Sequence, residues 1–471
     1  MKTMLNNIID NTANKLDIKD NGDKETLKKY SNKTIKEFPN LIVFPSVSDS
    51  EDDISKQKLC EFYYSKKDQC HMLKTYNVAG FVRLDNKLDL RIKSRFGGEK
   101  DYFLQYMICK VFNVNILSLA YAAQKSNELS AMALLLLPTY ILKAYRKGLF
   151  RSYKRFKKNN DRVRGAIDVA RHIRQNPLFN GKIAYTSREY SYDNHITQLV
   201  RHAVEYAKTL EVGKALLSHS VELIKALQEL EYATPSYALQ RRNEVININK
   251  KPFSHPYYSE YADLQKLCLM ILKQKGLDFT SSSDENVQGI LFDVSWLWEE
   301  YLWSVLKDAD FIHSNNKKFK NGIKAFDIEI PQYEIPYCEV NNEIYPDFYN
   351  DKMIIDAKYK EMTKIKDNKI QINVDRKDIY QMMSYMHLLK RNLGMLVYPF
   401  LYEKNIINYK FNDNDKIQAN DKIQAYGFRI SKNTDLKEFC EEMKTQEINF
   451  KEYLDQNSSP LIALASLARR L

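Results

Sequence analysis

The chain has 471 residues, a formal net charge of +12 at pH 7 and a pI of about 9.0. This length is too great for one ordinary domain and predicts two or three. Hydrophobic residues make up 44% of the sequence, which is enough to bury several cores. The positive charge favours a polyanionic partner, although a lysine-rich composition alone would give the same excess.

Cysteine usage and hydropathy exclude further classes of protein. The six cysteines are scattered, form no CxxC pair and have no histidine at zinc-finger spacing: Cys60, Cys70, Cys109, Cys268, Cys338 and Cys440. This pattern argues against a structural zinc site or a disulfide framework and fits a reducing, cytoplasmic location. The polar start is unlike a signal peptide. The apolar stretch 131–142 is shorter than the roughly 18 residues of a membrane span, so we expect a buried helix and no membrane partner.

The first hundred residues predict a polar segment followed by a small β domain. Residues 1–35 resemble a mobile polar lead-in. Residues 36–100 contain short apolar runs separated by turns, among them HMLKTYNVAGFVRL and KLDLRIKSRF. Asp85-Asn86 lies between two alternating runs and predicts a hairpin turn.

Residues 101–275 show the three-to-four spacing of apolar residues that predicts helices, including one from Glu128 to Phe156. A strongly basic segment, residues 143–164, lies within this region and has aromatic residues interleaved among its charges. The segment is either a surface that contacts phosphates or a partner, or the solvated face of a long amphipathic helix. The sequence does not decide between the two.

After a polar loop at 276–289, the rhythm changes to alternating helices and strands. We expect helices over 292–306 and 375–391, and strands over 325–340, 394–402, 406–411 and 426–430. Residues 290–457 therefore predict an α/β domain with a mixed sheet, followed by a tail at 458–471. The expected fold class is multidomain α+β, with a small N-terminal β domain and a helical middle region.

The stretch EIYPDFYNDKMIIDAKYK, residues 343–360, has the residues of a hydrolytic site. A tight turn at Asp351-Lys352 would place Asp347 directly opposite Asp356, with their Cβ atoms about 4.5–5.5 Å apart. Lys358 lies two residues beyond Asp356 and would point to the same face of the strand. A three-residue loop would shift the register and separate these groups, so the two-residue turn is the assumption to test.

Two opposed carboxylates repel each other, and a divalent cation between them would reverse the sign of that interaction. Mg²⁺, or alternatively Mn²⁺, is suited to hard oxygen ligands. Such an ion lowers the pKa of its bound water and stabilises charge on a phosphate under attack. A lysine beside it can orient the water or neutralise the developing charge. By itself the pattern is weak, because Asp-x-Lys is common in a lysine-rich chain.

Two flanking features strengthen the hypothesis. Gln381 and Tyr385 are four residues apart on a predicted helix and share one face, although they could equally lie at the edge of a methionine-rich core helix. Glu299, in the predicted helix LFDVSWLWEEYL, could complete a metal site or lie on a solvated face.

The order of helix glutamate, PD, DxK and QxxxY is similar to the RecB-like branch of PD-(D/E)XK nucleases. More narrowly, the chain resembles the McrC family, the nuclease subunit of two-component restriction systems that act on modified DNA. The blocks NVAGFVRLDNKLDLRIKSRF, RVRGAIDVARHIRQNP, LFDVSWLWEEYL, YPDFYNDKMIIDAKYK and DIYQMMSYMHLL carry the resemblance, which spans roughly residues 75–403. Thr197-Gln198 departs from the family pattern, which has an asparagine after Asp193-Asn194.

The resemblance implies roles for individual residues. Asp347, Asp356 and Glu299 would bind the metal, Lys358 would be the catalytic lysine, and Gln381 and Tyr385 would match the QxxxY pair. It also implies an antiviral endonuclease that cuts double-stranded, 5-methylcytosine-containing DNA together with a McrB-like hexameric AAA+ GTPase. The β domain, residues 36–100, and the helical partner-docking region, residues 101–275, would dock onto that ring and stimulate its GTPase activity, while the C-terminal domain cuts. The chain itself has no GxxxxGK[ST] phosphate-binding loop.

Two other functions remain open. The chain could be a stand-alone or site-specific restriction nuclease with its own recognition surface. It could also be a catalytically silent scaffold that activates a GTPase ring.

Overall fold

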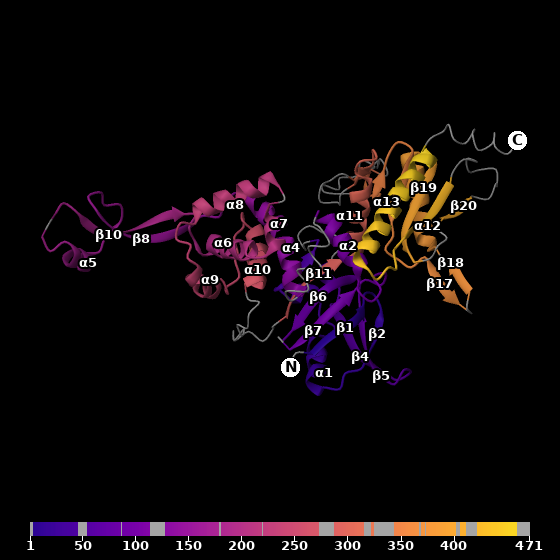
Figure 1. Ribbon diagram of the computed structural model, residues 1–471, viewed down its shortest axis with the longest axis horizontal. Helices are drawn as coiled ribbons and strands as arrows, with labels where there is room; N and C mark the ends of the chain where they lie inside the picture. Colours follow the sequence, from indigo (N-terminus) through magenta and orange to yellow (C-terminus); the bar gives the residue numbers. More distant parts are fainter. Residues whose placement is uncertain are drawn as a thin grey trace, which may run out of the picture. The chain divides into compact units, whose positions relative to one another are not determined.

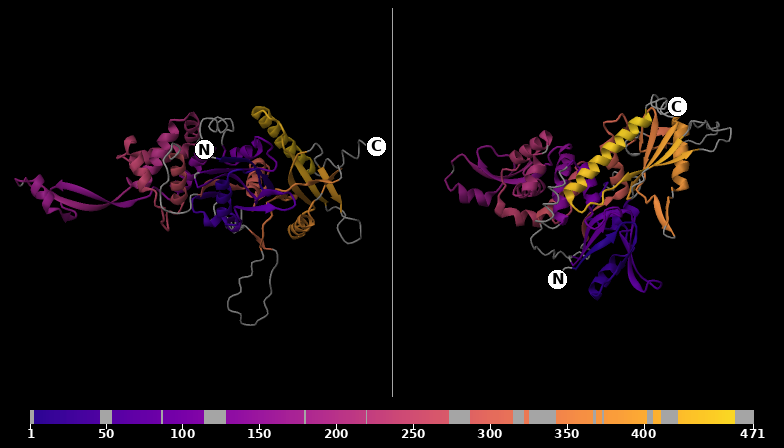
Figure 2. Two further views of the ribbon diagram at one scale, coloured as in Figure 1. Left: turned by 90° about the horizontal axis from the view of Figure 1, so that it is seen from below. Right: turned by 45° about the vertical axis from the view of Figure 1, so that its right-hand side comes forward.

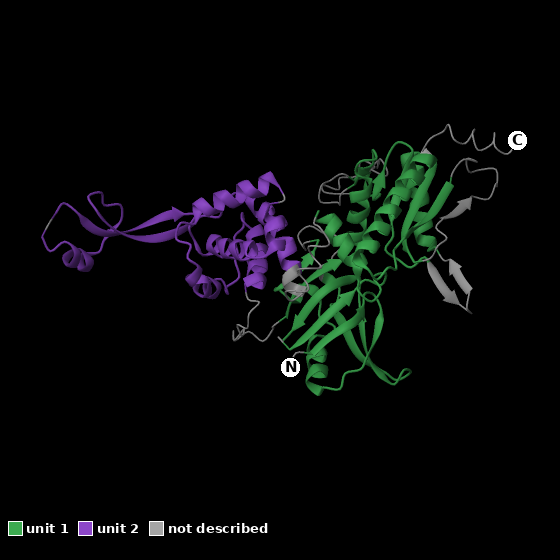
Figure 3. Ribbon diagram, in the orientation of Figure 1, with its two compact units in different colours: residues 1–117, 282–471 green, residues 118–281 purple. Residues whose placement is uncertain are grey.

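The computed structural model forms two compact units (Figure 3). Unit 1 combines residues 1–117 with 282–471, and unit 2 comprises residues 118–281. The described residues are 3–45, 54–85, 87–113, 128–178, 180–218, 220–272, 287–314, 322–324, 343–366, 369–372, 374–401, 406–410 and 422–458. Mixed sheets and helices confirm the expected multidomain α+β class. Within the described residues, no helix has the length and hydropathy needed to cross a membrane.

The N-terminal half of unit 1 is built on a sheet that contains a strand from far along the chain. Its order is β1 (Thr3–Ile9), β7 (Leu88–Lys93), β6 (Val78–Leu84), β11 (Val287–Asp293) and β3 (Leu41–Phe44). β6 and β7 form an antiparallel hairpin in which Leu84 pairs with Leu88. This pairing confirms the hairpin predicted around Asp85.

The expected mobile lead-in at residues 1–35 was wrong. β1 pairs in parallel with β7, and β2 (Ala13–Leu16) joins β5 (Cys70–Thr75) and β4 (Cys60–Ser65) in a second sheet. The helix α1 (Asn21–Tyr30) follows, with its Leu27 and Tyr30 side chains fully buried. The few apolar residues of this segment are separated by polar ones, and their partners lie far along the sequence. A local pattern therefore did not reveal them.

β11 occupies the last part of the segment expected to be a polar loop, whose residues 276–286 lie outside the described part of the chain. The strand runs antiparallel to β6 on one side and parallel to β3 on the other. Gly80 of β6 has φ of +142°, and a Cβ there would lie 2.2 Å from the carbonyl oxygen of Ile290, so only glycine permits this close approach. β11 leads directly into α11 (Val294–Leu306), whose first turn is capped by the side chain of Asp293.

The C-terminal half of unit 1 contains the mixed sheet expected for residues 290–457. Its order is β12 (Ile312–His313), β15 (Phe348–Tyr349), β16 (Met353–Ala357), β19 (Leu393–Phe400), β21 (Lys422–Arg429) and β20 (Ile406–Lys410). β16, β19 and β21 are parallel neighbours, whereas the remaining pairs are antiparallel. The strands predicted over 325–340 and the tail beyond residue 458 lie outside the described residues.

Helices and short ladders surround this sheet. α12 (Arg376–Leu389) packs its Met382 and Met386 side chains in a core with the strands, and α13 (Leu436–Ser458) runs along β21 (Figure 2). α2 (Tyr102–Val111) packs on α11 through aromatic contacts, so it belongs to unit 1 and not to the middle region. The two-stranded ladders are β13 (Ile323–Lys324) with β14 (Glu343–Ile344), and β17 (Thr363–Lys366) with β18 (Lys369–Ile372).

Unit 2 has a helical body, as the periodicity predicted. Its helices are α4 (Glu128–Tyr145), α6 (His195–Lys208), α7 (Glu211–Leu217), α8 (Val221–Ala233), α9 (Arg242–Ile248) and α10 (Glu260–Leu272). Residues 133–137 of α4 are almost completely buried, so the most apolar stretch of the sequence forms a core.

A long β ribbon extends from this helical body (Figure 1). β8 (Ser152–Asn160) pairs antiparallel with β10 (Ile183–Ser191), while β9 (Ala166–Ile167) and α5 (Val169–Gln175) lie toward its far end. The predicted continuation of the preceding helix to Phe156 was therefore wrong. α4 ends at Tyr145, and Gly148 adopts φ of +84° in the turn that follows. Lys154, Arg155, Lys157 and Lys158 of the basic segment then lie on β8, a strand of the ribbon.

Candidate active site

The hairpin of β15 and β16 has the register that the sequence analysis assumed. Phe348 pairs with Ile355, and the backbone N–H of Asn350 donates to Met353 O at 3.0 Å. Only Asp351 and Lys352 lie in the turn between them, which confirms the two-residue turn. The Asn350 side chain closes this turn by accepting hydrogen bonds from the backbone N–H groups of Lys352 and Met353, each at 2.9 Å. Continuing the register by one residue places Asp347 opposite Asp356.

The two faces of the hairpin have different chemistry. Phe348 and Ile355 are fully buried on one face and anchor the hairpin in the core. On the other face, Asp356 Oδ2 lies 2.5 Å from Lys358 Nζ. Asp347 Oδ2 accepts a hydrogen bond of 2.6 Å from the backbone N–H of Ala357. The structure thus brings both aspartates and the lysine together, because alternation along β16 directs residues 356 and 358 to the same side.

α12 adds the QxxxY pair to this cluster. Lys358 Nζ donates to Gln381 Oε1 at 3.0 Å, and Gln381 Nε2 donates to the Tyr385 hydroxyl at 2.8 Å. The Tyr385 hydroxyl in turn lies 3.4 Å from Tyr345 O, just before the hairpin. The shared helical face predicted from the four-residue spacing therefore looks toward the hairpin. The lysine ammonium therefore contacts both Gln381 and Asp356.

Glu299 of α11 completes the acidic group. Its carboxylate is close enough to Asp347 to raise the pKa of that residue. The helix is held against β19 because Trp298 Nε1 donates to Val397 O at 3.4 Å. The backbone N–H of Lys358 donates to the same carbonyl at 2.9 Å. One backbone oxygen therefore fixes both the helix with the glutamate and the strand end with the lysine.

The carboxyl groups of this cluster are electrostatically unfavourable as they stand. Burial raises the pKa of Asp347 well above its usual value, and the charges of Glu299 and Asp356 raise it further. Burial, together with Glu300 and Asp356, raises the pKa of Glu299 to about 8. Burial alone would lower the pKa of Lys358, but the neighbouring aspartates outweigh burial and raise it. One ammonium is shared among three acids, so ionising all three would leave negative charge that only a further cation could balance.

This donor set suits a hard divalent cation. Mg²⁺ is commonly held by only one or two carboxylates, with water and phosphate oxygens completing its shell. Asp356 Oδ2 is buried and makes no hydrogen bond of regular geometry, although it contacts the lysine ammonium. Among the residues that the structure describes, no set of three or more His, Cys, Asp or Glu side chains is gathered tightly enough to enclose a metal. Asp347 and Asp356 alone match the one or two carboxylates that Mg²⁺ usually takes from a protein.

His313 is a neighbour of the cluster that the sequence analysis did not identify. Its Nε2 lies 3.1 Å from Glu299 Oε1, and burial lowers the pKa of His313 to about 4. The imidazole is therefore neutral at pH 7 and lies beside the glutamate without adding a positive charge. Its only signal in the sequence was a histidine after an apolar pair, which is also typical of a core residue.

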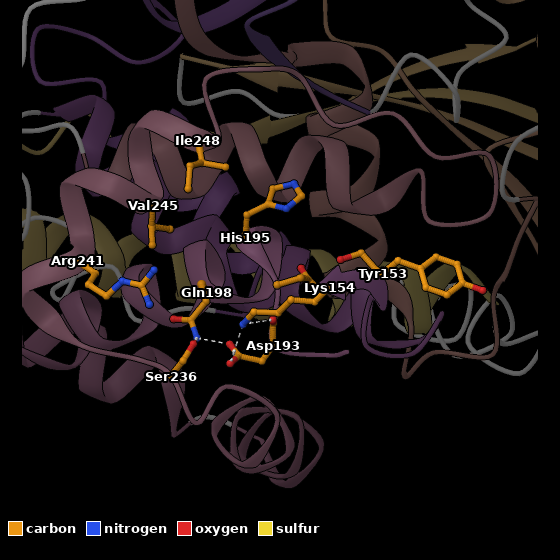
Figure 4. Close-up of a pocket in the computed structure, with 11 residues that line it drawn as sticks. Tyr153, Lys154, Asp193, His195, Gln198, Ser236, Arg241, Val245 and Ile248 are labelled. Carbon is orange, nitrogen blue, oxygen red and sulfur yellow. Dashed lines mark hydrogen bonds and ion pairs between the residues drawn. The ribbon is translucent and has the colours of Figure 1, made fainter. Parts of the chain in front are cut away.

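A second polar cluster lies in unit 2, where β8 meets the helical body (Figure 4). Lys154 Nζ lies 3.4 Å from Asp193 Oδ2, and Gln198 Nε2 donates to Asp193 Oδ1 at 2.5 Å. Gln198 also donates to Ser236 Oγ at 3.1 Å. These residues line a pocket of about 230 Å³. Burial tends to raise the pKa of Asp193, but hydrogen bonds from Ser236 and Gln198, with the charge of Lys154, lower it overall.

The departure noted at Thr197-Gln198 has a structural role in this cluster. Thr197 and Asn194 form a reciprocal cap at the start of α6, in which Asn194 Oδ1 accepts from the Thr197 N–H at 3.2 Å. Gln198 supplies the hydrogen bonds to Asp193 and Ser236.

Comparison with known proteins gave a family and several similar solved structures. No curated protein matched the chain. A refined half-complex from a tetradecameric assembly of Thermococcus gammatolerans McrB AAA+ hexamers with bound McrC is similar, with 16% identity and a TM-score of 0.48. That similarity covers 96% of this chain and 100% of that chain. A cryo-EM structure of the Thermococcus gammatolerans McrBC complex shares 19% identity with a TM-score of 0.31, covering 65% of this chain and 87% of that one.

The family comparison is the decisive one. A model described as McrBC 5-methylcytosine restriction system component matches residues 73–399. This match covers more than half of the chain and includes the candidate active site. The protein therefore belongs to the family of McrBC 5-methylcytosine restriction system components, as its resemblance to McrC predicted.

Proposed function

We propose that this chain is the Mg²⁺-dependent endonuclease subunit of a McrBC-like restriction system and that its cleaving centre is of the PD-(D/E)XK type. The observation that carries the proposal is the meeting of Asp347, Asp356 and Lys358 on one face of a β hairpin. Buried carboxyl groups with strongly raised pKa values beside a specific charge partner are typical of functional sites. The match to the McrBC family also supports this proposal.

The proposed metal would be held by Asp347 and Asp356, with Glu299 nearby. When bound, a divalent cation supplies a more acidic water and stabilises negative charge on the scissile phosphate. Mn²⁺ has similar ligand preferences and is the expected substitute.

Lys358 and the QxxxY pair would orient the reactants. In the absence of substrate the ammonium bridges Asp356 Oδ2 and Gln381 Oε1, which holds it at the edge of the acidic group. From there it can hold the attacking water or neutralise the developing charge on the phosphate. Tyr385 fixes the Gln381 amide by accepting its hydrogen bond, so the glutamine keeps its oxygen directed at the lysine.

The partner of this chain would be an AAA+ GTPase ring, with modified double-stranded DNA as the substrate. The related Thermococcus gammatolerans structure contains McrB AAA+ hexamers with bound McrC. Unit 2 is the part of the chain that we expect to dock on the ring, and the net charge of +12 suits a nucleic acid nearby. Cytosine methylation is the modification that the family description names.

The test is a cleavage assay on methylated and unmethylated DNA with the AAA+ partner, GTP and Mg²⁺. We expect Asp347→Ala, Asp356→Ala and Lys358→Ala each to abolish cleavage and to leave partner binding and GTP hydrolysis unchanged. Asp351→Ala is the matched control, because Asp351 lies in the turn of the same hairpin with its side chain fully exposed. This control should cleave like the unaltered protein.

Three results would contradict parts of the proposal. Full cleavage by the Asp356→Ala protein would refute the assigned site. Cutting of unmethylated DNA by the purified chain without nucleotide would favour a stand-alone nuclease. Stimulation of GTP hydrolysis without any cleavage would identify a scaffold that has lost its nuclease role.

A further inference from the structure

Arg95, in the turn that follows β7, forms a buried ion pair with Asp10 at the end of β1. Arg95 Nε and Nη2 lie 2.9 Å and 2.5 Å from Asp10 Oδ2, and the Arg95 backbone N–H donates to Asp10 Oδ1 at 2.6 Å. The Asp10 side chain is fully buried and that of Arg95 is 11% exposed. These three hydrogen bonds fix the orientation of the Arg95 side chain, so its planar guanidinium forms a rigid platform at the edge of the N-terminal sheet.

One side of this platform reaches the start of α11. Arg95 Nη2 donates to Asn77 Oδ1 at 2.9 Å. The Asn77 amide then donates to Asp293 Oδ1 at 3.2 Å and to Ser295 Oγ at 2.6 Å. Asp293 caps the helix that contains Glu299, so the contact chain ends at the first turn of that helix.

The other side reaches the residue next to the candidate catalytic lysine. The Arg95 guanidinium lies 4.9 Å from the centre of the Tyr359 ring, in a cation–π contact. The Tyr359 hydroxyl is 2.6 Å from Ser94 Oγ, and its ring meets Phe96 edge-on at 5.1 Å. Tyr359 is only 4% exposed. Three consecutive residues of the N-terminal sheet's turn therefore enclose the side chain that follows Lys358.

We infer that Arg95 is a positioning residue for the candidate active site, which joins the start of α11 and the Lys358–Tyr359 segment to one rigid point on the N-terminal sheet. Its effect on cleavage rests on the proposed function, whereas its effect on backbone order does not. Glu299 and Lys358 belong to different elements, and their relative position depends on what both elements are attached to. A displacement of about 1 Å in such a group can lower a reaction rate by about 10²-fold.

The alternative is that Arg95 only stabilises the fold. Arg83 offers a matched comparison, because it forms a similar fork with Asp89 in the same sheet, with Nε–Oδ1 and Nη2–Oδ2 distances of 2.7 and 2.8 Å. The two side chains of this pair are 14% and 11% exposed, and both residues lie in the β6–β7 hairpin. If Arg95 has only a stabilising role, replacing either arginine should have the same consequences.

The test compares Arg95→Lys with Arg83→Lys in the full chain assembled with its AAA+ partner. Each variant keeps the charge and loses the planar fork. We expect Arg95→Lys to lower the single-turnover cleavage rate about 10- to 100-fold without changing the KM for DNA or partner-stimulated GTP hydrolysis. Backbone amide exchange at residues 356–360 and 293–299 should become faster. Arg83→Lys should leave the cleavage rate and both exchange rates within about twofold of the unaltered protein.

Equal cleavage and equal exchange in the two variants would overturn the inference. If the unaltered protein does not cleave DNA, the proposed function fails, and faster exchange at residues 356–360 in Arg95→Lys alone still supports the inference.

Ser94→Ala and Tyr359→Phe provide a test should Arg95→Lys fold poorly. Both remove a group from the same hydroxyl pair and leave the ion pair intact. We expect the double variant to cleave no more slowly than either single variant, because both single variants lose the same contact. Fully additive losses, or no loss in either single variant, would contradict the inference.

Discussion

Units 1 and 2 each place an aspartate beside a lysine and a glutamine, yet the two clusters have opposite electrostatics. In unit 2, hydrogen bonds and one ammonium satisfy Asp193, so the pKa of its carboxyl group is lowered despite burial. In unit 1, Asp356 has a comparable lysine and glutamine nearby, but Asp347 and Glu299 add negative charge that one ammonium does not balance. Burial then keeps the pKa of each of these acids raised.

The comparison shows that residue types alone do not mark a functional site. An Asp–Lys–Gln group with its charges balanced stabilises a fold, and here it joins a ribbon to its helical body. The same group with an excess of buried negative charge reduces stability, which is expected where a cation and a phosphate are to bind. Four predictions test this distinction.

The largest difference in cleavage rate should follow from replacing Lys358 in unit 1 and Lys154 in unit 2. Lys358→Met should lower single-turnover cleavage by about 10³-fold, because it removes the ammonium that we propose neutralises charge on the scissile phosphate. Lys154→Met should leave the rate of the saturated complex within about threefold, since Lys154 is paired with Asp193 in unit 2. Rapid-quench measurement at saturating partner would show this, and a similar loss in both variants would remove the distinction.

The two glutamines should differ by a smaller factor. Gln381→Ala should lower cleavage about 10- to 100-fold by releasing the Lys358 ammonium, without a large change in stability, because Gln381 is exposed. Gln198→Ala should instead lower the free energy of unfolding by about 1–2 kcal/mol, because it removes two hydrogen bonds from a buried side chain. Denaturant titration with a parallel cleavage assay separates these effects.

Neutralising the aspartates should change stability in opposite directions. In the presence of a chelator, Asp347→Asn should raise the free energy of unfolding by about 1 kcal/mol, since it removes a buried carboxyl group whose ionised form is unfavourable beside Glu299 and Asp356. Asp193→Asn should lower it by about 1–2 kcal/mol, since it removes a satisfied charge. Added Mg²⁺ should raise the melting temperature of the unaltered protein and of Asp193→Asn, but not that of Asp347→Asn. A destabilised Asp347→Asn protein would argue against excess negative charge in unit 1.

Lowering the pH should also change the stability of the two units in opposite directions. Burial raises the pKa of Asp101 in unit 1 to about 7, so the folded state binds a proton more tightly and gains stability as the pH falls from 7. Burial and the charges of Arg242, Arg241 and Arg201 lower the pKa of His202 in unit 2 to about 4. Only the unfolded state then gains a proton between pH 6.5 and 4, so unit 2 should lose about 2 kcal/mol at pH 5.

Amide exchange measured at pH 7 and pH 5, corrected for its intrinsic pH dependence, resolves the two units. Protection should fall in α6, which contains His202, and should hold or rise in β7 near Asp101. A His202→Gln protein should lose most of the pH sensitivity in unit 2. Equal loss of protection in both units would contradict the opposite effects expected from Asp101 in unit 1 and His202 in unit 2.

Local patterns predicted the parts of the fold whose partners are close in sequence. The β15–β16 register followed from the alternation of Phe348 and Ile355 with acids and from the assumed two-residue turn, so the shared face of Asp356 and Lys358 could be anticipated. The face shared by Gln381 and Tyr385 followed from helical spacing.

Other features depend on distant partners or on competing periodicities. Thr3 pairs with Leu88, and Gly289 pairs with both Val82 and Leu41, which no local pattern encodes. In β8 the spacing of charged and aromatic residues fits either a helix or a strand. The segment is a strand of the ribbon because β10 pairs with it along its whole length. His313 was missed because a single buried histidine gives no indication of the acid it contacts.

The position of unit 2 in the sequence has a consequence for how such proteins diversify. Unit 1 supplies residues on both sides of residues 118–281, and β11 must return to a place between β6 and β3. Paired genetic crossovers near the two boundaries would exchange unit 2 whole and leave the sheet of unit 1 with its own strands. A single crossover inside unit 2 would join β6 of one lineage to β11 of another, and their interlocked side chains would have to match by chance. Hybrid proteins made by paired crossovers should therefore fold far more often than hybrids made by a single crossover inside unit 2.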